Sequence, residues 1–157
     1  MEQVRGGGIS EAVIARFVDV ATDALAAARE EIDALNVYPI PDGDTGTNMF
    51  LTMSGAREAL QQAMGEGRGT AETLRAFTRG ALLAARGNSG VILSQLLSAL
   101  VDRILSARPG ERNAAVMAAA ISAATDAAYA AVGKPVEGTI LTVARTAAEA
   151  AERVGAR

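Results

Sequence analysis

The feature of this 157-residue sequence that most limits its fold is the spacing of its apolar residues. Apolar side chains recur every three or four residues through six long segments, and no segment alternates with a period of two. This spacing predicts an all-α chain. Short loops between long helices further predict antiparallel neighbours, in an up-and-down bundle or barrel of amphipathic helices.

Loop residues divide the chain into the expected helices. We expect helices over residues 10–35, from 45–47 to 64, 70–86, 88–105, 113–132 and 139–154. The expected capping side chains belong to Ser10, Thr45 or Thr47, Thr70, Asn113 and Thr139. Half of the sequence is hydrophobic but only 3% is aromatic, so the helices must pack closely through small side chains. We expect a flexible tail over residues 1–9 and one helical domain over residues 10–157.

The segment between the first two predicted helices, residues 36–49, holds two of the four prolines and two carboxylates one residue apart. Its prolines exclude a helix, and its glycines permit tight bends, so Asp42 and Asp44 can point toward one place. Asp, Asn and Thr oxygens are hard ligands of the kind that Mg²⁺ prefers. The helix that follows would offer free N–H groups to an anion. The segment therefore indicates a metal and nucleotide-phosphate site.

Other interpretations of the Asp-Gly-Asp motif were compared with the sequence. An EF-hand loop starting at Asp42 needs Gly and Glu where Thr47 and Met53 stand. A phosphatase of the Asp-x-Asp-x-Thr type needs Thr in place of Gly46 and a preceding strand. The remaining alternative is a polar turn that leads into a helix without binding anything.

The antiparallel arrangement brings three helix starts to one end of the bundle. These starts are residues 44–48, 87–90 and 137–139, and each combines glycine with a hydroxyl or amide side chain. Unpaired backbone N–H groups and helix dipoles at that end favour anions. The opposite end carries ordinary Gly/Arg loops, so one end is predicted to bind phosphate.

Composition excludes several classes of chemistry. The chain has no histidine and no cysteine, which removes imidazole and thiolate as bases, nucleophiles or metal ligands. The net charge of −3 argues against a nucleic-acid partner. We find no window of about 18 uncharged apolar residues and no signal peptide, and therefore expect a cytoplasmic protein that is not integral to the membrane.

Three segments carry a family resemblance. Residues 35–49, 85–95 and 135–142 resemble, in order, the three nucleotide-binding motifs of the bacterial fatty acid kinase ATP-binding subunit. More distantly, the chain is similar to the nucleotide-binding L domain of dihydroxyacetone kinases. The resemblance covers about residues 10–150, and its first motif is long and very specific.

The resemblance implies a helical barrel that binds Mg-ATP at one end. Asp42 and Asp44 match the metal-binding aspartates, which bridge two Mg²⁺ ions to the phosphates and act in catalysis. Asn36 falls where a further metal ligand stands, although the loop here is one residue longer. Met49 either packs on the adenine or fills the core. The positions that match phosphate or nucleotide contacts are Thr45, Gly46, Thr47, Asn48, Met49, Asn88, Ser89, Gly90, Gly138 and Thr139.

The function implied is phosphoryl transfer from ATP to the carboxylate of a fatty acid held by a separate fatty-acid-binding partner protein. A carboxylate acceptor is already deprotonated at pH 7, so the absence of histidine is no obstacle. The alternatives are a dihydroxyacetone-type kinase subunit, a nucleotide-sensing regulatory module without turnover, and a plain helical scaffold. The chain stops within a helical pattern, whereas family domains continue, so an exposed apolar flank and pairing into a homodimer are expected.

Overall fold

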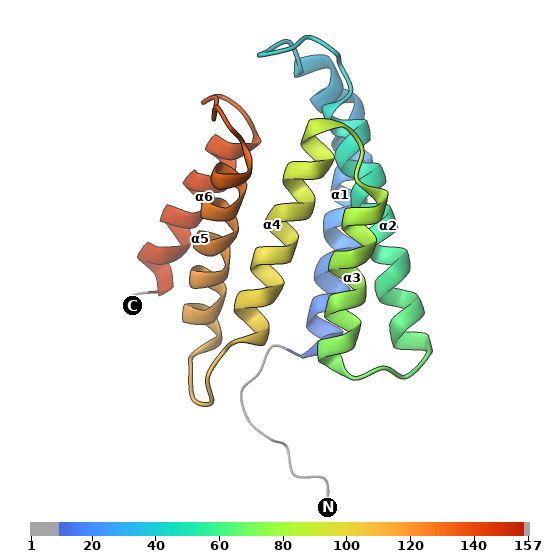
Figure 1. The fold of residues 1–157 in the computed structure, drawn as a ribbon, viewed down its shortest axis with the longest axis vertical. Helices are drawn as coiled ribbons and strands as arrows, with labels where there is room; N and C mark the ends of the chain where they lie inside the picture. Colours follow the sequence, from blue (N-terminus) through green and yellow to red (C-terminus); the bar gives the residue numbers. More distant parts are fainter. Residues whose placement is uncertain (1–9, 156–157) are drawn as a thin grey trace, which may run out of the picture.

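The structure is a computed structural model that describes residues 10–155, so the predicted tail at residues 1–9 lies outside the described residues. Every regular element within that range is a helix. The helices are α1 (Glu11–Leu35), α2 (Thr45–Gly65), α3 (Thr70–Ala84), α4 (Gly87–Leu105), α5 (Asn113–Ala131) and α6 (Ile140–Gly155). They run up and down in alternation, each packed on the next (Figure 1), which confirms the all-α antiparallel prediction.

The predicted helix starts are right to within a residue, but three of the predicted caps, those of α2, α3 and α5, are wrong. Ser10 Oγ accepts a hydrogen bond from Val13 N at 3.3 Å, as expected for a capping serine. At the starts of α3 and α5, however, the cap positions belong to Gly69 and Arg112, with no capping side chain. The Thr70 hydroxyl instead donates to Glu11 at 3.2 Å, because α1 passes beside the start of α3.

The core lies where α1 to α4 meet. It consists mainly of Ile14, Val18, Met53, Ala56, Leu60, Leu74, Phe77, Ala81, Leu97 and Val101. Close helix contact depends on small residues, as the composition predicts. A Cβ atom on Gly80 would clash with Ala59 and the Gly55 carbonyl, and one on Gly55 would clash with Ala84. The α2–α3 pair therefore packs backbone against backbone.

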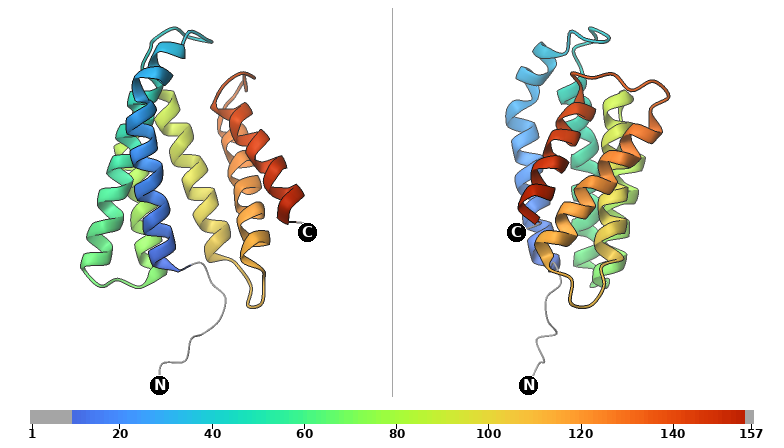
Figure 2. Two further views of the ribbon diagram at one scale, coloured as in Figure 1. Left: turned by 180° about the vertical axis from the view of Figure 1, so that it is seen from behind. Right: turned by 90° about the vertical axis from the view of Figure 1, so that its left-hand side faces the viewer.

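The last two helices form a thinner layer, and the ring of helices is not closed. Helix α6 packs on α5, and no extensive packing joins α6 to α1 (Figure 2). Phe17, which belongs to the apolar helical spacing of residues 10–35, is nevertheless 57% exposed, together with Val13 and Val20 of the same helix. Val143 and Val154 of α6 are each 69% exposed. Both helices thus carry an apolar face that no described element covers.

Helix α5 bears on the expectation that the chain is not integral to a membrane. Among the described residues it is the one helix long and apolar enough, by length and composition, to cross a membrane. It contains one charged residue, Asp126, so no uncharged window of the length expected for a membrane span occurs in it. Ala120, Ala124 and Ala128 are buried in its packing against neighbouring helices, and 33% of its apolar window is buried.

Candidate functional site

The loop between α1 and α2 brings two of the three predicted metal ligands into contact. Asn36 follows α1 directly, and its side-chain amide donates a hydrogen bond to Asp42 Oδ1. The Asp42 backbone N–H donates to the Ile40 carbonyl at 3.0 Å, which tightens the turn. Asp44 occupies the cap position of α2, yet its carboxylate makes no capping hydrogen bond. The loop thus leaves carboxylate oxygens of both aspartates and the Asn36 amide oxygen available to a ligand.

These donors fit Mg²⁺ held together with a nucleotide. No group of three acidic or histidine side chains able to hold a metal occurs within residues 10–155. Two carboxylates and one amide are too few for a cage made only of protein. They suffice for Mg²⁺, which typically takes one or two carboxylates and completes its shell with substrate phosphates and water.

Asp33, near the end of α1, is the residue at this end that sequence reasoning missed. Its carboxylate accepts hydrogen bonds from Thr47 N at 3.1 Å and from Thr47 Oγ1 at 2.7 Å. These hydrogen bonds, the Thr47 hydroxyl first, hold the pKa of Asp33 below its ordinary value. The predicted capping by Thr45 or Thr47 is therefore wrong: the anion at the start of α2 comes from α1. Asp33 is 14 positions from Thr47, so no local capping pattern indicates it.

This contact changes what two predicted residues do in the structure. The Thr47 N–H and hydroxyl are both engaged by Asp33. Gly46 is buried, and a Cβ atom there would clash with the Arg29 carbonyl, so this glycine permits close packing of α2 on α1. Thr45 and Met49 are half-buried, whereas Met53 is in the core, as expected.

The structure joins the first and second motifs directly. The Asn48 side chain lies against Gly87, whose positive φ of 57° and lack of a side chain make room for it. One turn further along α2, Thr52 Oγ1 donates to the Asn48 carbonyl at 2.7 Å and accepts from Arg86 N at 3.3 Å. Gly90 packs on the same hydroxyl. The start of α4 is therefore held against the start of α2.

Helix α4 presents the more open helix N-terminus of the two. Its cap position, Arg86, provides no side-chain hydrogen bond to the helix. Asn88 is exposed and Ser89 is half-buried, whereas Gly90 is buried. First-turn N–H groups that lack a capping side chain attract phosphate oxygens.

The third motif lies at the same end but is satisfied within itself (Figure 1). Gly138 N donates to Thr142 Oγ1 at 2.7 Å, and the Thr139 hydroxyl donates to the Val136 carbonyl at 2.8 Å. Thr139 Oγ1 also accepts from Leu141 N at 3.3 Å, as the predicted cap of α6 should.

Glu137 organises this loop. It accepts hydrogen bonds from Thr142 Oγ1 at 2.6 Å and from Tyr129 at 3.1 Å, and these lower its pKa. Arg145, whose guanidinium carbon lies 3.8 Å from the centre of the Tyr129 ring, also pairs with Glu137 at 3.5 Å. All these contacts lie within residues 129–145, so the described hydrogen bonds do not tie the third motif to the first two.

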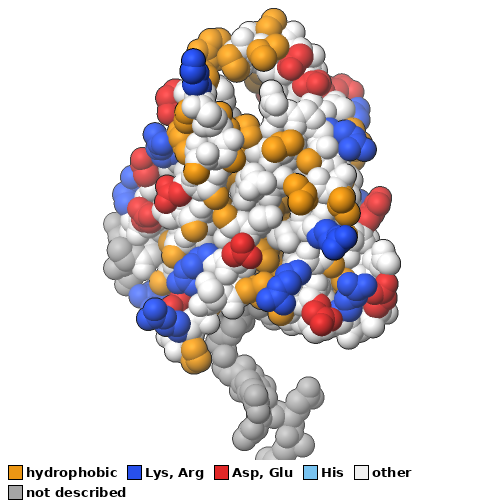
Figure 3. All heavy atoms as spheres, viewed as in Figure 1, with side chains coloured by type: hydrophobic (Ala, Val, Ile, Leu, Met, Phe, Trp, Pro, Cys, Tyr) orange, Lys and Arg blue, Asp and Glu red, His pale blue; other side chains and the backbone are white. Residues whose placement is uncertain are grey.

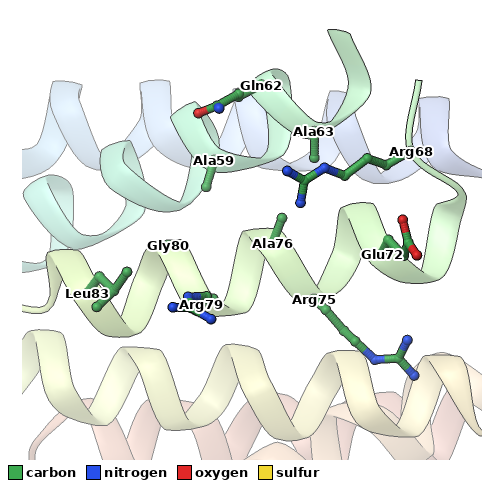
Figure 4. A pocket seen from close by; sticks show the side chains of 10 residues that line it. All are labelled: Ala59, Gln62, Ala63, Arg68, Glu72, Arg75, Ala76, Arg79, Gly80 and Leu83. Atoms are coloured by element: carbon green, nitrogen blue, oxygen red, sulfur yellow. The ribbon is translucent and has the colours of Figure 1, made fainter. Parts of the chain in front are cut away.

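A large concave surface lies elsewhere on the described chain. A groove of 640 Å³ runs along the outer side of α2 and α3, bordered by Arg68, Arg75 and Arg79 (Figure 4). It contains none of the predicted site residues. Arg68 is already paired with Glu66 at 2.6 Å. The two aspartates lie at the end formed by the α1–α2 loop, away from this groove.

Comparison with known proteins agrees with this geometry. Residues 39–157 match the family model of the DAK2 domain. The chain thus belongs to the DAK2 domain family, the dihydroxyacetone kinase L-domain superfamily of kinase-related, nucleotide-binding helical modules.

Uncharacterized proteins of Staphylococcus aureus strains USA300, N315 and MRSA252 are each 52% identical to it over 120 residues. That match covers 76% of this chain but 21% of each relative, so the chain spans about a fifth of their length.

Proposed function

We propose that this chain binds Mg-ATP at the end formed by the α1–α2 loop and the start of α4, and transfers the γ-phosphoryl group to a fatty acid carboxylate. The acceptor is held by a separate fatty-acid-binding protein, and the product is an acyl phosphate. Asp42, Asp44 and Asn36 hold Mg²⁺, two ions in all. Backbone N–H groups of α4, with Asn88 and Ser89, contact the phosphates.

The observation that carries the proposal is the joining of α2 to α4. Asn48 against Gly87, and Thr52 between Asn48 and Arg86, place the carboxylate loop and an uncapped helix N-terminus at one end. Phosphoryl transfer depends mainly on positioning and on neutralising phosphate charge, and these two features supply both. Bound Mg²⁺ would neutralise developing charge on the phosphates.

The chemistry of the chain favours a carboxylate acceptor. Transfer to a hydroxyl benefits from a general base, and the sequence contains no histidine. A fatty acid carboxylate is ionised at pH 7 and needs no proton removed.

The first experiment is a calorimetric ATP titration of the chain with Mg²⁺ and with EDTA. We expect binding that requires Mg²⁺. The second incubates the chain with Mg-ATP and an oleate-loaded fatty-acid-binding protein from the same genome, and traps acyl phosphate with hydroxylamine. Dihydroxyacetone with its own carrier subunit is the comparison acceptor.

The outcomes separate the functions. Acyl hydroxamate that depends on ATP and on the loaded partner supports the proposal. Phosphorylation of dihydroxyacetone alone would establish the other kinase activity. Mg-dependent ATP binding without transfer to either acceptor would favour a nucleotide-sensing module. Absence of ATP binding would favour the plain helical scaffold, in which these loops only begin helices.

A further inference from the structure

The outer groove between α2 and α3, here called the α2–α3 groove, has a floor of small residues. Ala59 and Ala63 of α2 point toward α3, and Ala76 of α3 points toward α2 (Figure 4). Gly80 lies so close to α2 that a Cβ atom on it would clash with Ala59. Because the two helices meet through side chains of this size, the surface along their line of contact is hollow, with a volume of 640 Å³.

Arginine side chains border this floor. The Arg68 guanidinium lies between α2 and α3, next to Ala63 and Ala76, whereas Arg75 and Arg79 extend from α3 itself (Figure 4). Figure 3 shows basic side chains gathered over α3 on the same face of the molecule. The groove thus combines an uncharged floor with positive charge along its border.

The positive charge in the groove is not neutralised by its acidic neighbours. Glu72 is the single acidic residue among those that line it. Arg68 forms an ion pair with Glu66 at 2.6 Å. Arg75 and Arg79 are exposed, and neither forms an ion pair with another residue in the range 10–155. Two guanidinium groups therefore remain for carboxylates of another molecule.

The shape of the groove indicates a helical occupant. The lining residues of α3 lie between positions 72 and 83, which is about three helical turns or about 17 Å. A helix of that length can lie along the floor with small or apolar side chains inward. Its carboxylates would then meet Arg75 and Arg79, which are four residues apart and lie on one face of α3.

Two other anionic occupants fit less well. A flat lipid surface does not follow a hollow between two helices, and the residues that line the groove include no aromatic side chain to anchor in a membrane interface. The net charge of −3 argues against nucleic acid. Charge complementarity and shape together favour a protein segment.

We infer that the α2–α3 groove binds an acidic amphipathic helix of another protein. Carboxylates of that helix pair with Arg75 and Arg79, and its small or apolar side chains contact the floor at Ala76. The groove lies away from the α1–α2 loop, so the inference does not depend on the proposed kinase function. Because exposed ion pairs are screened by salt, affinity falls as ionic strength rises.

The probe is a fluorescein-labelled helical peptide with glutamate on one face and alanine and leucine on the other. A second peptide carries lysine in place of each glutamate. Binding of each peptide to the full 157-residue chain is measured by fluorescence anisotropy at low and at physiological salt. Circular dichroism and denaturant unfolding check that each variant of the chain keeps its fold.

Three variants are compared with the wild type. Arg75→Glu with Arg79→Glu reverses the charge beside the groove. Arg16→Glu with Arg112→Glu makes the same change in net charge at exposed arginines of α1 and of the α4–α5 turn, outside the groove. Ala76→Leu fills the floor at a half-buried position and changes no charge.

We expect the acidic peptide to bind the wild type, and its Kd to rise at least about tenfold in the charge-reversed groove variant, where attraction becomes repulsion. Ala76→Leu should weaken binding to a similar extent, and the control with Arg16 and Arg112 changed should bind like the wild type. The lysine peptide should bind the charge-reversed groove variant more tightly than it binds the wild type. A purely structural effect of these two substitutions would not produce that gain.

The inference is overturned by any of three results. These are no saturable binding of the acidic peptide at millimolar concentration, equal losses in the groove and control charge variants, and unchanged affinity in Ala76→Leu. The last two would mean attraction to a charged surface without insertion into the groove.

Vesicles of phosphatidylglycerol and sedimentation velocity test the other occupants. Sedimentation of the wild type with the vesicles, lost in the charge-reversed groove variant and without peptide binding, would assign these arginines to a lipid surface and overturn the inference. Loss of self-association in the same variant, again without peptide binding, would assign the groove to a second copy of the chain and overturn it as well. Peptide binding that Ala76→Leu weakens supports the partner helix.

Discussion

At the scale of single residues, the candidate site depends on side chains whose roles differ although their sequence motif is continuous. Asp42 and Asp44 keep carboxylate oxygens available to a ligand, whereas the Thr47 hydroxyl donates to Asp33 and Gly46 packs on Arg29. The motif therefore contains some side chains that are available to a ligand and others that hold α2 against α1. Substitutions separate the two kinds.

Asp42→Ala and Asp44→Ala should each lower the affinity for Mg-ATP by more than about tenfold, because each removes an anionic metal ligand. Helicity should stay unchanged, since neither carboxylate caps α2. Calorimetry and circular dichroism measure the two effects. Asp23→Ala, which removes an exposed ion pair between Asp23 of α1 and Arg57 of α2, is the control and should bind ATP normally. Wild-type ATP affinity in both site variants would reject the metal-ligand assignment.

Gly87→Ala should destabilise the fold by about 1–3 kcal/mol, the usual cost of a strained backbone conformation at a residue other than glycine. Gly87 has φ of 57°, and a Cβ atom there would clash with the Asn48 amide. Mg-ATP affinity should also fall because Asn48 is displaced. Gly133→Ala is the matched control, since a Cβ atom there meets nothing within 4 Å. Denaturant unfolding measures the loss of stability. Equal unfolding midpoints for the wild type and Gly87→Ala would show that the fold does not require the close approach of Asn48 to Gly87.

At the scale of elements, a side chain of α1 accepts the hydrogen bonds that a local capping residue would accept at the start of α2. Asp33 takes the place of a local cap at the start of α2. The contact between Asp33 of α1 and Thr47 of α2 therefore joins the two helices on either side of the α1–α2 loop. The α3–α4 turn is held in a similar way by Thr52 of α2. Both helix starts that form the candidate site are therefore positioned by tertiary hydrogen bonds.

Asp33→Ala should reduce stability by about 1 kcal/mol at pH 7, the typical contribution of a capping side chain. The folded-state pKa of Asp33 lies below its ordinary value of 3.8, so its contribution is present above that pH and is lost as pH falls through the lowered pKa. The wild-type and Asp33→Ala unfolding curves should thus converge as the pH falls below 3.8. A difference that is constant from pH 7 to pH 3 would contradict the ionic role of Asp33.

At the scale of the whole molecule, six helices in sequence order form an open arrangement rather than a closed ring. The candidate site occupies one end of the α1–α4 core, and the α5–α6 layer brings its own loop to the same end. Two apolar faces, on α1 and α6, lie outside the described core. Two predictions concern the whole molecule: its stabilisation by a bound ligand and its self-association.

Mg-ATP should raise the free energy of unfolding by about 2.7 kcal/mol at a concentration one hundred times its Kd, because it binds the folded state. Mg²⁺ alone should have little effect, since two carboxylates and an amide need phosphate oxygens to complete the metal shell. Thermal unfolding with Mg²⁺, with ATP plus EDTA, and with both together measures this. If ATP with EDTA stabilised the chain as much as ATP with Mg²⁺, the nucleotide would bind without a metal ion at the α1–α2 loop.

The exposed faces of α1 and α6 predict that this chain self-associates at high concentration. Phe17→Asp combined with Val143→Asp should shift the chain toward monomer in sedimentation velocity, because each change places a charge in an apolar contact. Leu83→Asp, equally exposed but on α3, should leave the distribution unchanged. A wild-type chain that stays monomeric at millimolar concentration would contradict this prediction.

Local spacing was enough to predict the six helices, their order and the common end of the three glycine-containing helix starts, because helical periodicity and Gly/Pro breaks are properties of neighbouring residues. It also indicated Asp42 and Asp44 as a pair, since they lie within one loop, whereas Asn36 was added by the family resemblance. The role of Asp33, the exposure of Phe17 and the missing caps at Thr45 or Thr47, Thr70 and Asn113 depended on which helix lies beside which. Those contacts join residues far apart in the chain, and only the packed tertiary structure determines them.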